Sequence, residues 1–258
     1  MYTDKREKRK EDVLVGRNAV FEALRAGRPV DSVLIAKGNS GGPVRRIVEL
    51  CRERGVVIKD VSSVKLDAIC GGMSHQGVAA MAAAHEYVGV SDMLHAAKER
   101  GEPPFLVICD EINDPHNLGA IIRTAECCGA HGVIIPKRGA VGLTAAVDKA
   151  ASGALEYMPV ARVSNLAATV EELKKEGVWV YGTDMDGQPF YETDFSGGAA
   201  VIIGSEGKGI SRLLREKCDV VVSIPMRGRI TSLNASVAAG IVLYEAAKTR
   251  IRTGGGKA

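Results

Sequence analysis

Five uninterrupted runs of apolar residues constrain the fold of this chain most strongly. They occupy residues 105–109, 132–135, 178–182, 199–203 and 220–224. A strand with one face in water alternates apolar and polar residues, so continuous runs indicate strands buried on both faces of a parallel sheet. Helical periodicity fills the intervals, at residues 118–128, 141–151, 166–175, 211–216 and 236–248. We therefore predict a doubly wound α/β domain over residues 105–252.

The N-terminal part has shorter elements. Helical patterns at residues 16–26 and 44–54 alternate with strand-like runs at 32–36, 56–60 and 77–82, which predicts a small α/β domain over residues 13–85. Residues 86–104 contain one short helical pattern at 91–99 followed by chain-breaking residues, and are predicted to link the domains. Residues 1–12 are predicted to form a basic, disordered tail, or alternatively an arm that touches phosphates. Residues 253–258 are predicted to form a second tail.

Composition excludes several classes of protein. Aromatic residues make up only 4% of the chain, which argues against an RNA-binding sheet of stacked aromatic side chains. The six cysteines form no CxxC pair and no zinc-like His/Cys spacing, so we expect small buried side chains and no metal. Without a signal-like N-terminus or a run of about 18 apolar residues, the sequence predicts a soluble cytoplasmic protein with no membrane partner. The net charge of +3 permits a polyanionic partner without requiring one.

Three polar segments follow the predicted strands, where α/β sheets bind their ligands. In the first, residues 110–123, Asn117 suits either a helix cap or a ligand contact. Arg123 lies farther along the same predicted helix. Alone it is typical of a surface arginine with a buried stem, and beside the other segments it suits a phosphate or oxyanion clamp.

The second segment, residues 203–210, has the glycine order GxxGxG. It matches neither the GxGxxG dinucleotide pattern nor a Walker motif, which disfavours a conventional nucleotide-binding enzyme. Its Glu206 is suited to neutralise Lys208, to cap a following helix, or to contact a ligand. The third segment, residues 224–241, carries a basic loop before a helix rich in small residues, and Ser232 or Asn234 is expected to open that helix.

Together these segments resemble the three motifs of the SpoU (TrmH-like) RNA 2′-O-ribose methyltransferases of the SPOUT superfamily. The matching text is DPHNLGAIIRTAE at 114–126, IIGSEGKG at 202–209 and SIPMRGRITSLNASVAAGI at 223–241. The stretch 132–166, VGRNAVFEAL at 15–24 and HQGVAA at 75–80 extend the resemblance over nearly the whole chain. The subgroup that it resembles most closely is the bacterial enzyme that methylates a guanosine ribose in 23S rRNA.

The resemblance implies a trefoil-knotted C-terminal domain, an N-terminal L30e/L7Ae-like RNA-binding domain, and a homodimer with the site near its interface. It implies S-adenosylmethionine as the cofactor and RNA as the partner, without a metal. The implied cofactor contacts are Thr183, Gly204, Ile224, Met226 and Leu233. The implied catalytic or substrate residues are Asn117, Arg123, Glu206, Ser232 and Asn234.

Three alternatives remain open at this point. Within the family, the rival substrates are a tRNA ribose and a different rRNA nucleotide. A non-catalytic RNA-binding or ribosome-assembly protein is the rival class, although every implied catalytic residue is present. For Arg123, the resemblance implies a general base, whereas the difficulty of removing a proton from a guanidinium favours an electrostatic clamp on phosphate and emerging alkoxide.

Overall fold

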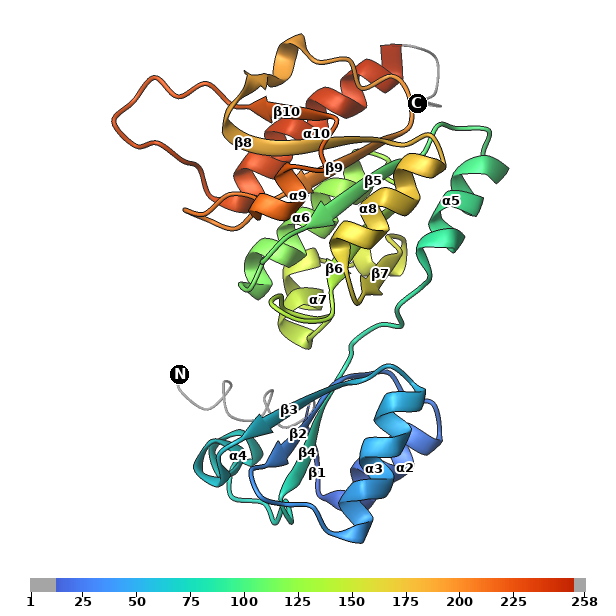
Figure 1. Ribbon diagram of the computed structural model, residues 1–258, viewed down its shortest axis with the longest axis vertical. Helices are drawn as coiled ribbons and strands as arrows, with labels where there is room; N and C mark the ends of the chain where they lie inside the picture. Colours follow the sequence, from blue (N-terminus) through green and yellow to red (C-terminus); the bar gives the residue numbers. More distant parts are fainter. Residues whose placement is uncertain (1–12, 253–258) are drawn as a thin grey trace. The chain divides into compact units, whose positions relative to one another are not determined.

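The computed structural model describes residues 13–252, so the two predicted tails lie outside the described residues. The chain divides into two compact units (Figure 1). Unit 1 takes the residues up to Glu86 together with Gly142–Ala145, and unit 2 takes Tyr87–Val141 and the residues from Ala146 onward. Each unit has its own sheet and its own core, and each is described separately.

Unit 1 is a four-stranded mixed sheet in the order β1-β4-β2-β3. Its elements are β1 (Val13–Val15), α2 (Arg17–Arg25), β2 (Val30–Ala36), α3 (Gly42–Glu53), β3 (Val57–Val61), α4 (Ser63–Cys70) and β4 (Val78–Ala82). Side chains alternate along β2, so Val33 and Ile35 join the core beneath α2 and α3. Leu34 and Ala36 join the core beneath α4 on the other face. The unit therefore has helices on both faces of its sheet.

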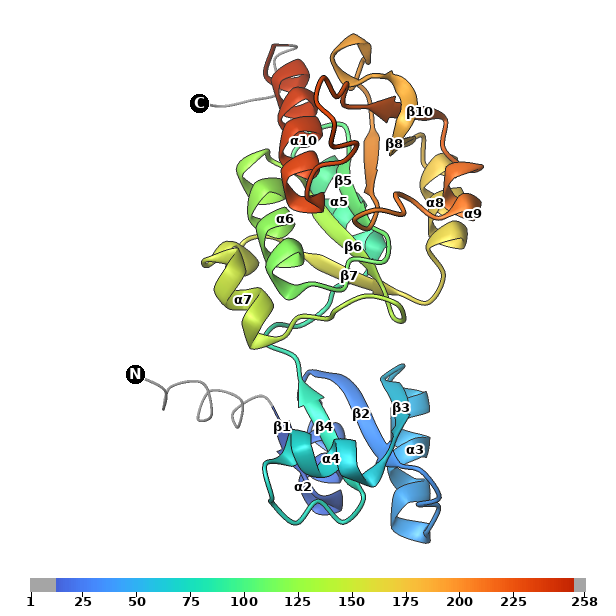
Figure 2. The same cartoon turned by 90° about the vertical axis from the view of Figure 1, so that its left-hand side faces the viewer.

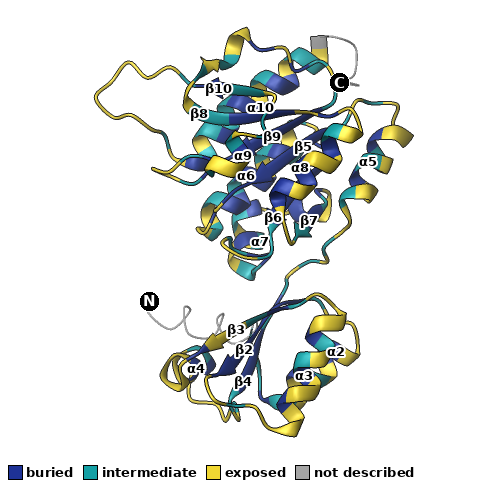
Figure 3. Cartoon of the chain, in the orientation of Figure 1, coloured by how far each residue is buried: buried dark blue, intermediate teal, exposed yellow. Residues whose placement is uncertain are grey.

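Unit 2 is a six-stranded parallel sheet in the order β10-β8-β9-β5-β6-β7. Its strands are β5 (Phe105–Cys109), β6 (Gly132–Pro136), β7 (Val160–Val163), β8 (Trp179–Pro189), β9 (Ala199–Ile203) and β10 (Val220–Ser223). The side chains of central strand β5 are fully buried, as Figure 3 shows for the middle of the sheet. The prediction of a parallel sheet buried on both faces is confirmed.

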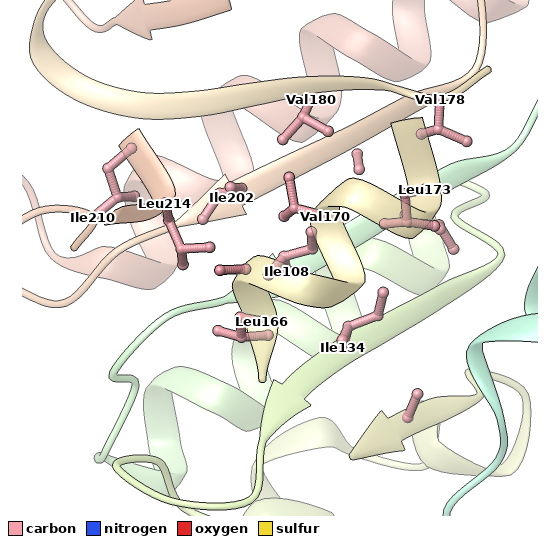
Figure 4. Packing of buried hydrophobic residues seen from close by; sticks show 14 of the residues in the cluster. Ile108, Ile134, Leu166, Val170, Leu173, Val178, Val180, Ile202, Ile210 and Leu214 are labelled. Carbon is pink, nitrogen blue, oxygen red and sulfur yellow. The ribbon is translucent and has the colours of Figure 1, made fainter. Parts of the chain in front are cut away.

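Helices cover both faces of this sheet (Figure 2). They are α5 (Val90–Glu99), α6 (Pro115–Cys127), α7 (Ala145–Ala151), α8 (Leu166–Lys175), α9 (Arg212–Arg215) and α10 (Ala235–Arg252), with 3-10 turns at Ala154–Glu156 and Phe190–Glu192. Helices α6 and α10 pack against each other on one face. On the other face, Val170 and Leu173 of α8 pack on Ile108, Ile134 and Ile202 from three strands (Figure 4).

Residues 86–104 differ from the predicted linker. Met93 and Ala97, one helical turn apart on α5, are buried, and Met93 belongs to the core beneath α8. Burial of this apolar face makes α5 part of unit 2. Helix α7 begins at Ala145, later than the predicted residue 141. The sequence does not predict the short elements β1, α4 and β7, because each has too few residues to show a clear alternation of apolar and polar side chains.

The end of α10 is fixed by Arg250. Its guanidinium donates to the carbonyl oxygens of Phe195 at 3.3 Å and Gly197 at 2.7 Å, and to that of Pro103. The same group lies 5.0 Å from the centre of the Phe105 ring. Three carbonyl groups from two separate segments are thereby satisfied by one side chain.

A buried histidine supports the start of the central strand. The Nδ1 atom of His131 accepts a hydrogen bond from the Phe105 backbone N–H at 3.0 Å, and Nε2 lies 3.1 Å from a carboxylate oxygen of Glu102. Burial lowers the pKa of His131 from its ordinary value of 6.5, against the opposing effect of Glu102. The ring is therefore the neutral tautomer with its proton on Nε2.

The six cysteines are free thiols, and most are shielded. Burial raises the pKa of Cys51, Cys128 and Cys218 to about 11 and that of Cys109 to about 12. Only Cys127, at the end of α6, is exposed. The prediction of small buried side chains therefore holds for Cys51, Cys70 and Cys109.

Candidate functional site

A cavity of about 190 Å³ lies at the carboxyl ends of β9 and β10, beside the middle of β8. It is formed by the glycine loop after β9, by a stretch of β8, and by the segment from β10 to α10, which loops out from unit 2 in Figure 1. The lining residues are Thr183, Asp184, Met185, Ile203, Gly204, Ser205, Glu206, Gly207, Lys208, Gly209, Val222, Ile224, Met226, Thr231, Ser232, Leu233, Ala235 and Ala238. All five residues expected to contact a cofactor are among them.

The glycine loop is closed on itself. The Ser205 N–H donates to the Gly209 carbonyl at 3.1 Å, and the Gly209 N–H donates back to the Ser205 carbonyl at 3.0 Å. A Cβ atom on Gly204 would lie only 2.1 Å from the carbonyl carbon of Gly209. Gly207 has a φ of 80° and Gly209 a φ of 67°, a region that favours glycine. The loop needs glycine both for close approach and for its backbone angles.

The wall contributed by β8 is an excursion from the sheet. Gly182 pairs with Val221 and Gln188 with Val222, so the five residues between them, 183–187, have no place in the ladder. At one end Thr183 donates its hydroxyl to the Ile202 carbonyl at 2.9 Å. At the other end a Cβ on Gly187 would meet the Val221 backbone at 2.5 Å. The excursion is therefore fixed at both ends and faces the cavity between them.

Three polar side chains meet beside the cavity. Asn117 Nδ2 donates to Glu206 Oε1 at 2.9 Å, and Asn234 Nδ2 donates to the same oxygen at 2.5 Å. Asn234 Nδ2 also lies 2.9 Å from Asn117 Oδ1, which accepts from it. The backbone N–H of Ala235 approaches Glu206 Oε1 at 3.5 Å. One carboxylate thus joins three segments that are far apart in the sequence.

The helix caps differ in part from the sequence interpretation. Asn234, and not Ser232, caps α10, since its Oδ1 accepts from the backbone N–H groups of Ser236 at 3.0 Å and Val237 at 3.3 Å. Helix α6 is capped by Asp114 rather than by Asn117, whose side chain is engaged with Glu206. The lysine of the glycine loop, Lys208, approaches Glu111 at 3.8 Å instead of Glu206.

Arg123 stands apart from the other candidate residues. It is exposed, it is not among the residues that line the cavity, and its Nη1 lies 3.5 Å from the Ser152 hydroxyl. It follows Asn117 by six residues, which at about 100° per residue turns it roughly 120° away around α6. Within one chain, Asn117, Glu206 and Asn234 are brought together, Ser232 lines the cavity, and Arg123 is not brought to it.

A cluster of three charged side chains, of which Asp184 lines the cavity, was missed in the sequence. Arg215 of α9 donates to Asp184 at 2.5 Å and lies 2.8 Å from Asp186, and both carboxylates belong to the β8 excursion. Hydrogen bonding to Asp184 raises the pKa of Arg215. The signal was the DxD pattern directly after an apolar run, which is too common to single out alone.

Residues 13–252 contain no group of three or more His, Cys, Asp or Glu side chains placed to hold a metal ion. Over the same residues, no helix combines the length and apolar character that a membrane crossing requires.

Comparison with known proteins agrees with the geometry. Residues 104–244 match the SpoU rRNA Methylase family, and residues 13–88 match the model described as RNA 2′-O ribose methyltransferase substrate binding. A TrmH family tRNA/rRNA methyltransferase of Bacillus subtilis (strain 168), YacO, is 49% identical over 93% of this chain and 96% of its own. A TrmH family tRNA/rRNA methyltransferase of Staphylococcus aureus (strain MSSA476) is 44% identical over 93% of this chain and 97% of its own.

Among solved structures, the SpoU methyltransferase AviRb from Streptomyces viridochromogenes, crystallised in complex with AdoMet, has a TM-score of 0.59 and 25% identity. The match covers 97% of this chain and 95% of AviRb. The family match takes in both the parallel-sheet unit and the glycine loop and polar residues at its strand ends. With a relative of nearly half identical sequence along almost its full length, the chain belongs to the SpoU (TrmH-like) family of RNA methyltransferases.

Proposed function

We propose that this RNA methyltransferase transfers a methyl group from S-adenosylmethionine to a ribose 2′-hydroxyl, and that its target is a guanosine of 23S rRNA. The observation that carries the proposal is the strand-end cavity, which lies directly beside the carboxylate–amide cluster of Asn117, Glu206 and Asn234. The proposed substrate implies a cytoplasmic protein.

The cavity suits this cofactor in its chemistry. Apolar side chains such as Ile224 and Leu233 offer surface for an adenine ring, and the glycine loop exposes backbone groups to a ligand. The carboxylate of Glu206 at the same cavity, whose described partners are neutral amides, favours a ligand that carries positive charge. When bound, S-adenosylmethionine supplies a methyl group on a sulfonium, which is already a good leaving group.

The chain must position and stabilise the nucleophile. A ribose hydroxyl is a weak nucleophile at neutral pH, so rigid hydrogen-bonding groups that hold it near the methyl carbon lower the barrier. Asn117 and Asn234 are held by one Glu206 oxygen, and Ser232 lies at the cavity. We assign these four residues to orienting the ribose. Arg123 is assigned to binding the adjacent phosphate and the developing alkoxide, because a guanidinium group keeps its proton in proteins and is a poor base.

This assignment requires a second copy of the chain, because Arg123 does not line the cavity of its own chain. Helix α10 carries three exposed apolar side chains, Val237, Tyr244 and Ile251, and their seven-residue spacing places them on one face of the helix. We propose that this face packs in a symmetric homodimer and that each copy supplies Arg123 to the site of the other.

Two further features belong to this proposal. Residues 105–252 would form the methyltransferase domain with a trefoil knot around the glycine loop and the β10–α10 segment. Residues 13–85 would form an L30e/L7Ae-like RNA-binding domain, an assignment supported by the four-stranded sheet with helices on both faces and by the match to the substrate-binding model.

Mixing two inactive variants tests the shared site. Arg123→Ala and Glu206→Ala should each abolish methylation of RNA. Reassembled from an equimolar mixture, half of the dimers would be mixed and each would hold one intact site, so about a quarter of wild-type activity should return. Arg123→Ala should retain cofactor affinity in calorimetry. Near-normal methylation by Arg123→Ala alone would remove this residue from the mechanism, and no recovery in the mixture would refute the shared site.

Mapping of ribose methylation in cells with and without the gene tests the substrate. A methyl group lost from a 23S rRNA guanosine supports the proposal. The relatives' names mention both tRNA and rRNA, so tRNA is the second candidate, and a loss confined to tRNA would replace the substrate while keeping the chemistry. Binding of RNA by the purified protein without any methyl transfer would favour the non-catalytic class.

A further inference from the structure

The β8 excursion is a wall of the cavity that lies outside the pairing of its own sheet. Residues 183–187 leave the sheet ladder, and Met185 near their middle is 68% exposed. Their ends are fixed through Thr183 and Gly187, as described above. Between those ends the excursion carries Asp184 and Asp186, two carboxylates that repel each other at short range. Something outside the excursion must hold this middle part in place.

Arg215 provides that contact. One guanidinium nitrogen binds Asp184 at 2.5 Å and the other lies 2.8 Å from Asp186, so a single planar fork bridges both carboxylates. The side chains of Arg215 and Asp184 are 33% and 21% exposed, so this ion pair is partly shielded from solvent. The Asp184 carboxylate also accepts the Met185 backbone N–H at 2.7 Å and would lie 3.7 Å from a Cβ on Gly209. The bridge therefore brings the excursion against the glycine loop.

The helix that carries Arg215 is itself anchored. The backbone N–H of Ser211, which precedes α9, donates to the carboxylate of buried Asp110 at 2.7 Å. Leu214 of the same helix is 3% exposed and belongs to the core beneath α8. Helix α9 is thus anchored to the end of β5 and to the core, and Arg215 connects the β8 excursion to this anchored helix.

We propose that Arg215 is a positioning residue for cofactor binding, which acts by bridging Asp184 and Asp186 and so holds the β8 excursion closed against the glycine loop. This inference rests on the proposed function, since it takes the cavity to be the cofactor site. Arg215 does not line the cavity, so it governs the affinity for S-adenosylmethionine and takes no part in methyl transfer.

Calorimetric titration with S-adenosylmethionine tests the role of Arg215. Replacement by alanine should weaken cofactor binding about 10-fold, because both carboxylates lose the group that joins them. Lysine keeps the charge but cannot bridge two carboxylates as a fork, so Arg215→Lys should recover part of the affinity and bind about 3-fold more weakly than wild type. The KM for the cofactor should rise in parallel, while kcat at saturating cofactor stays within about 2-fold of wild type.

Arg212→Ala is the matched control. Arg212 lies on the same helix, is 91% exposed, and pairs with Glu216 one turn away at 2.7 Å. Its removal should leave cofactor affinity unchanged. If Arg215→Ala binds the cofactor as tightly as Arg212→Ala does, the inference is overturned. A fall in kcat with an unchanged KM would overturn it as well.

A second variant covers the case in which Arg215→Ala does not fold. Asp186 is 73% exposed, so Asp186→Asn removes half of the bridge without disturbing the core, and should weaken cofactor binding about 2- to 3-fold. Unchanged affinity in that variant would overturn the inference. The assignment of the cavity as the cofactor site fails in a different way, because wild-type protein would then bind no S-adenosylmethionine, and a wrong RNA substrate would show only in the methylation mapping.

Discussion

Replacement of Gly204 by alanine is the sharpest test of how the glycine loop is built. An added Cβ would lie 2.1 Å from the carbonyl carbon of Gly209, 2.2 Å from its oxygen and 2.4 Å from the Ile210 nitrogen. All three atoms are backbone, so no side chain can turn aside. Ordinary contact begins near 3.4 Å, and the loop must therefore open by more than 1 Å.

That opening has a calculable cost. Moving Gly209 by this amount breaks both hydrogen bonds between Ser205 and Gly209, which are now 3.0 and 3.1 Å long. Two such bonds contribute about 0.5–1.5 kcal/mol each, and forcing an extra carbon into a packed site costs about 1–3 kcal/mol. We expect a loss of about 2–6 kcal/mol, which for a unit of this size lowers Tm by about 4–24 °C.

Thermal unfolding and calorimetric binding of S-adenosylmethionine measure the effect together. Cofactor affinity should fall with stability, because the displaced loop is a wall of the cavity. Two alanine variants serve as controls. Gly197→Ala has open space and should change neither quantity, and Gly207→Ala has open space but a φ of 80°, so it should cost only about 1–2 kcal/mol. A Gly204→Ala protein with wild-type Tm and affinity would refute the close-approach argument.

Three further predictions concern stability. The variant Gly119→Ala places a Cβ 2.4 Å from the Cβ of Ala150. It should lower the free energy of unfolding in urea by about 1–2 kcal/mol, although alanine has the better helix propensity. An unchanged urea midpoint would contradict this prediction. The variant Arg250→Ala leaves three carbonyl groups without their donor and should lower Tm. The variant Arg250→Lys should recover only part of the lost Tm. An equal Tm for the wild type and both variants would contradict the proposed stabilisation by Arg250. The pKa of His131 is lowered in the folded protein, so on acidification the unfolded chain binds a proton at a higher pH than the folded one. The free energy of unfolding should therefore fall as the pH drops below about 6.5. The variant His131→Gln should make this dependence on pH less steep. An identical slope in the variant would exclude His131 as the titrating group.

The sheet of unit 2 could be predicted because its signal is local. Strands β5 and β9 coincide with the apolar runs at 105–109 and 199–203, and α8 begins and ends at the predicted residues 166 and 175. A strand buried on both faces needs a continuous apolar run, and a helix on a sheet needs one apolar face. Both requirements can be met only by neighbouring residues, so they are visible in the sequence.

The contacts that shape the cavity could not be predicted, because they join residues far apart in the chain. Asn117 and Asn234 each had a plausible local role as a helix cap, and only the fold distinguishes Asn234, which caps, from Asn117, which does not. The β8 excursion depends on where β10 pairs, and its bridge to Arg215 spans about thirty residues. A DxD pattern alone does not indicate which basic residue it pairs with, because that depends on which side chains the fold brings near.

The exposure of Cys127 gives this protein a native attachment point for a spectroscopic probe. Among its six thiols it alone is exposed, and the raised pKa of the other five keeps them as protonated, unreactive thiols near neutral pH. It lies four residues after Arg123 on α6, so the two side chains share a face of that helix. A maleimide dye attached there, without any engineered cysteine, would sit one helical turn from the guanidinium, and its emission would report what approaches that face when subunits or RNA are added.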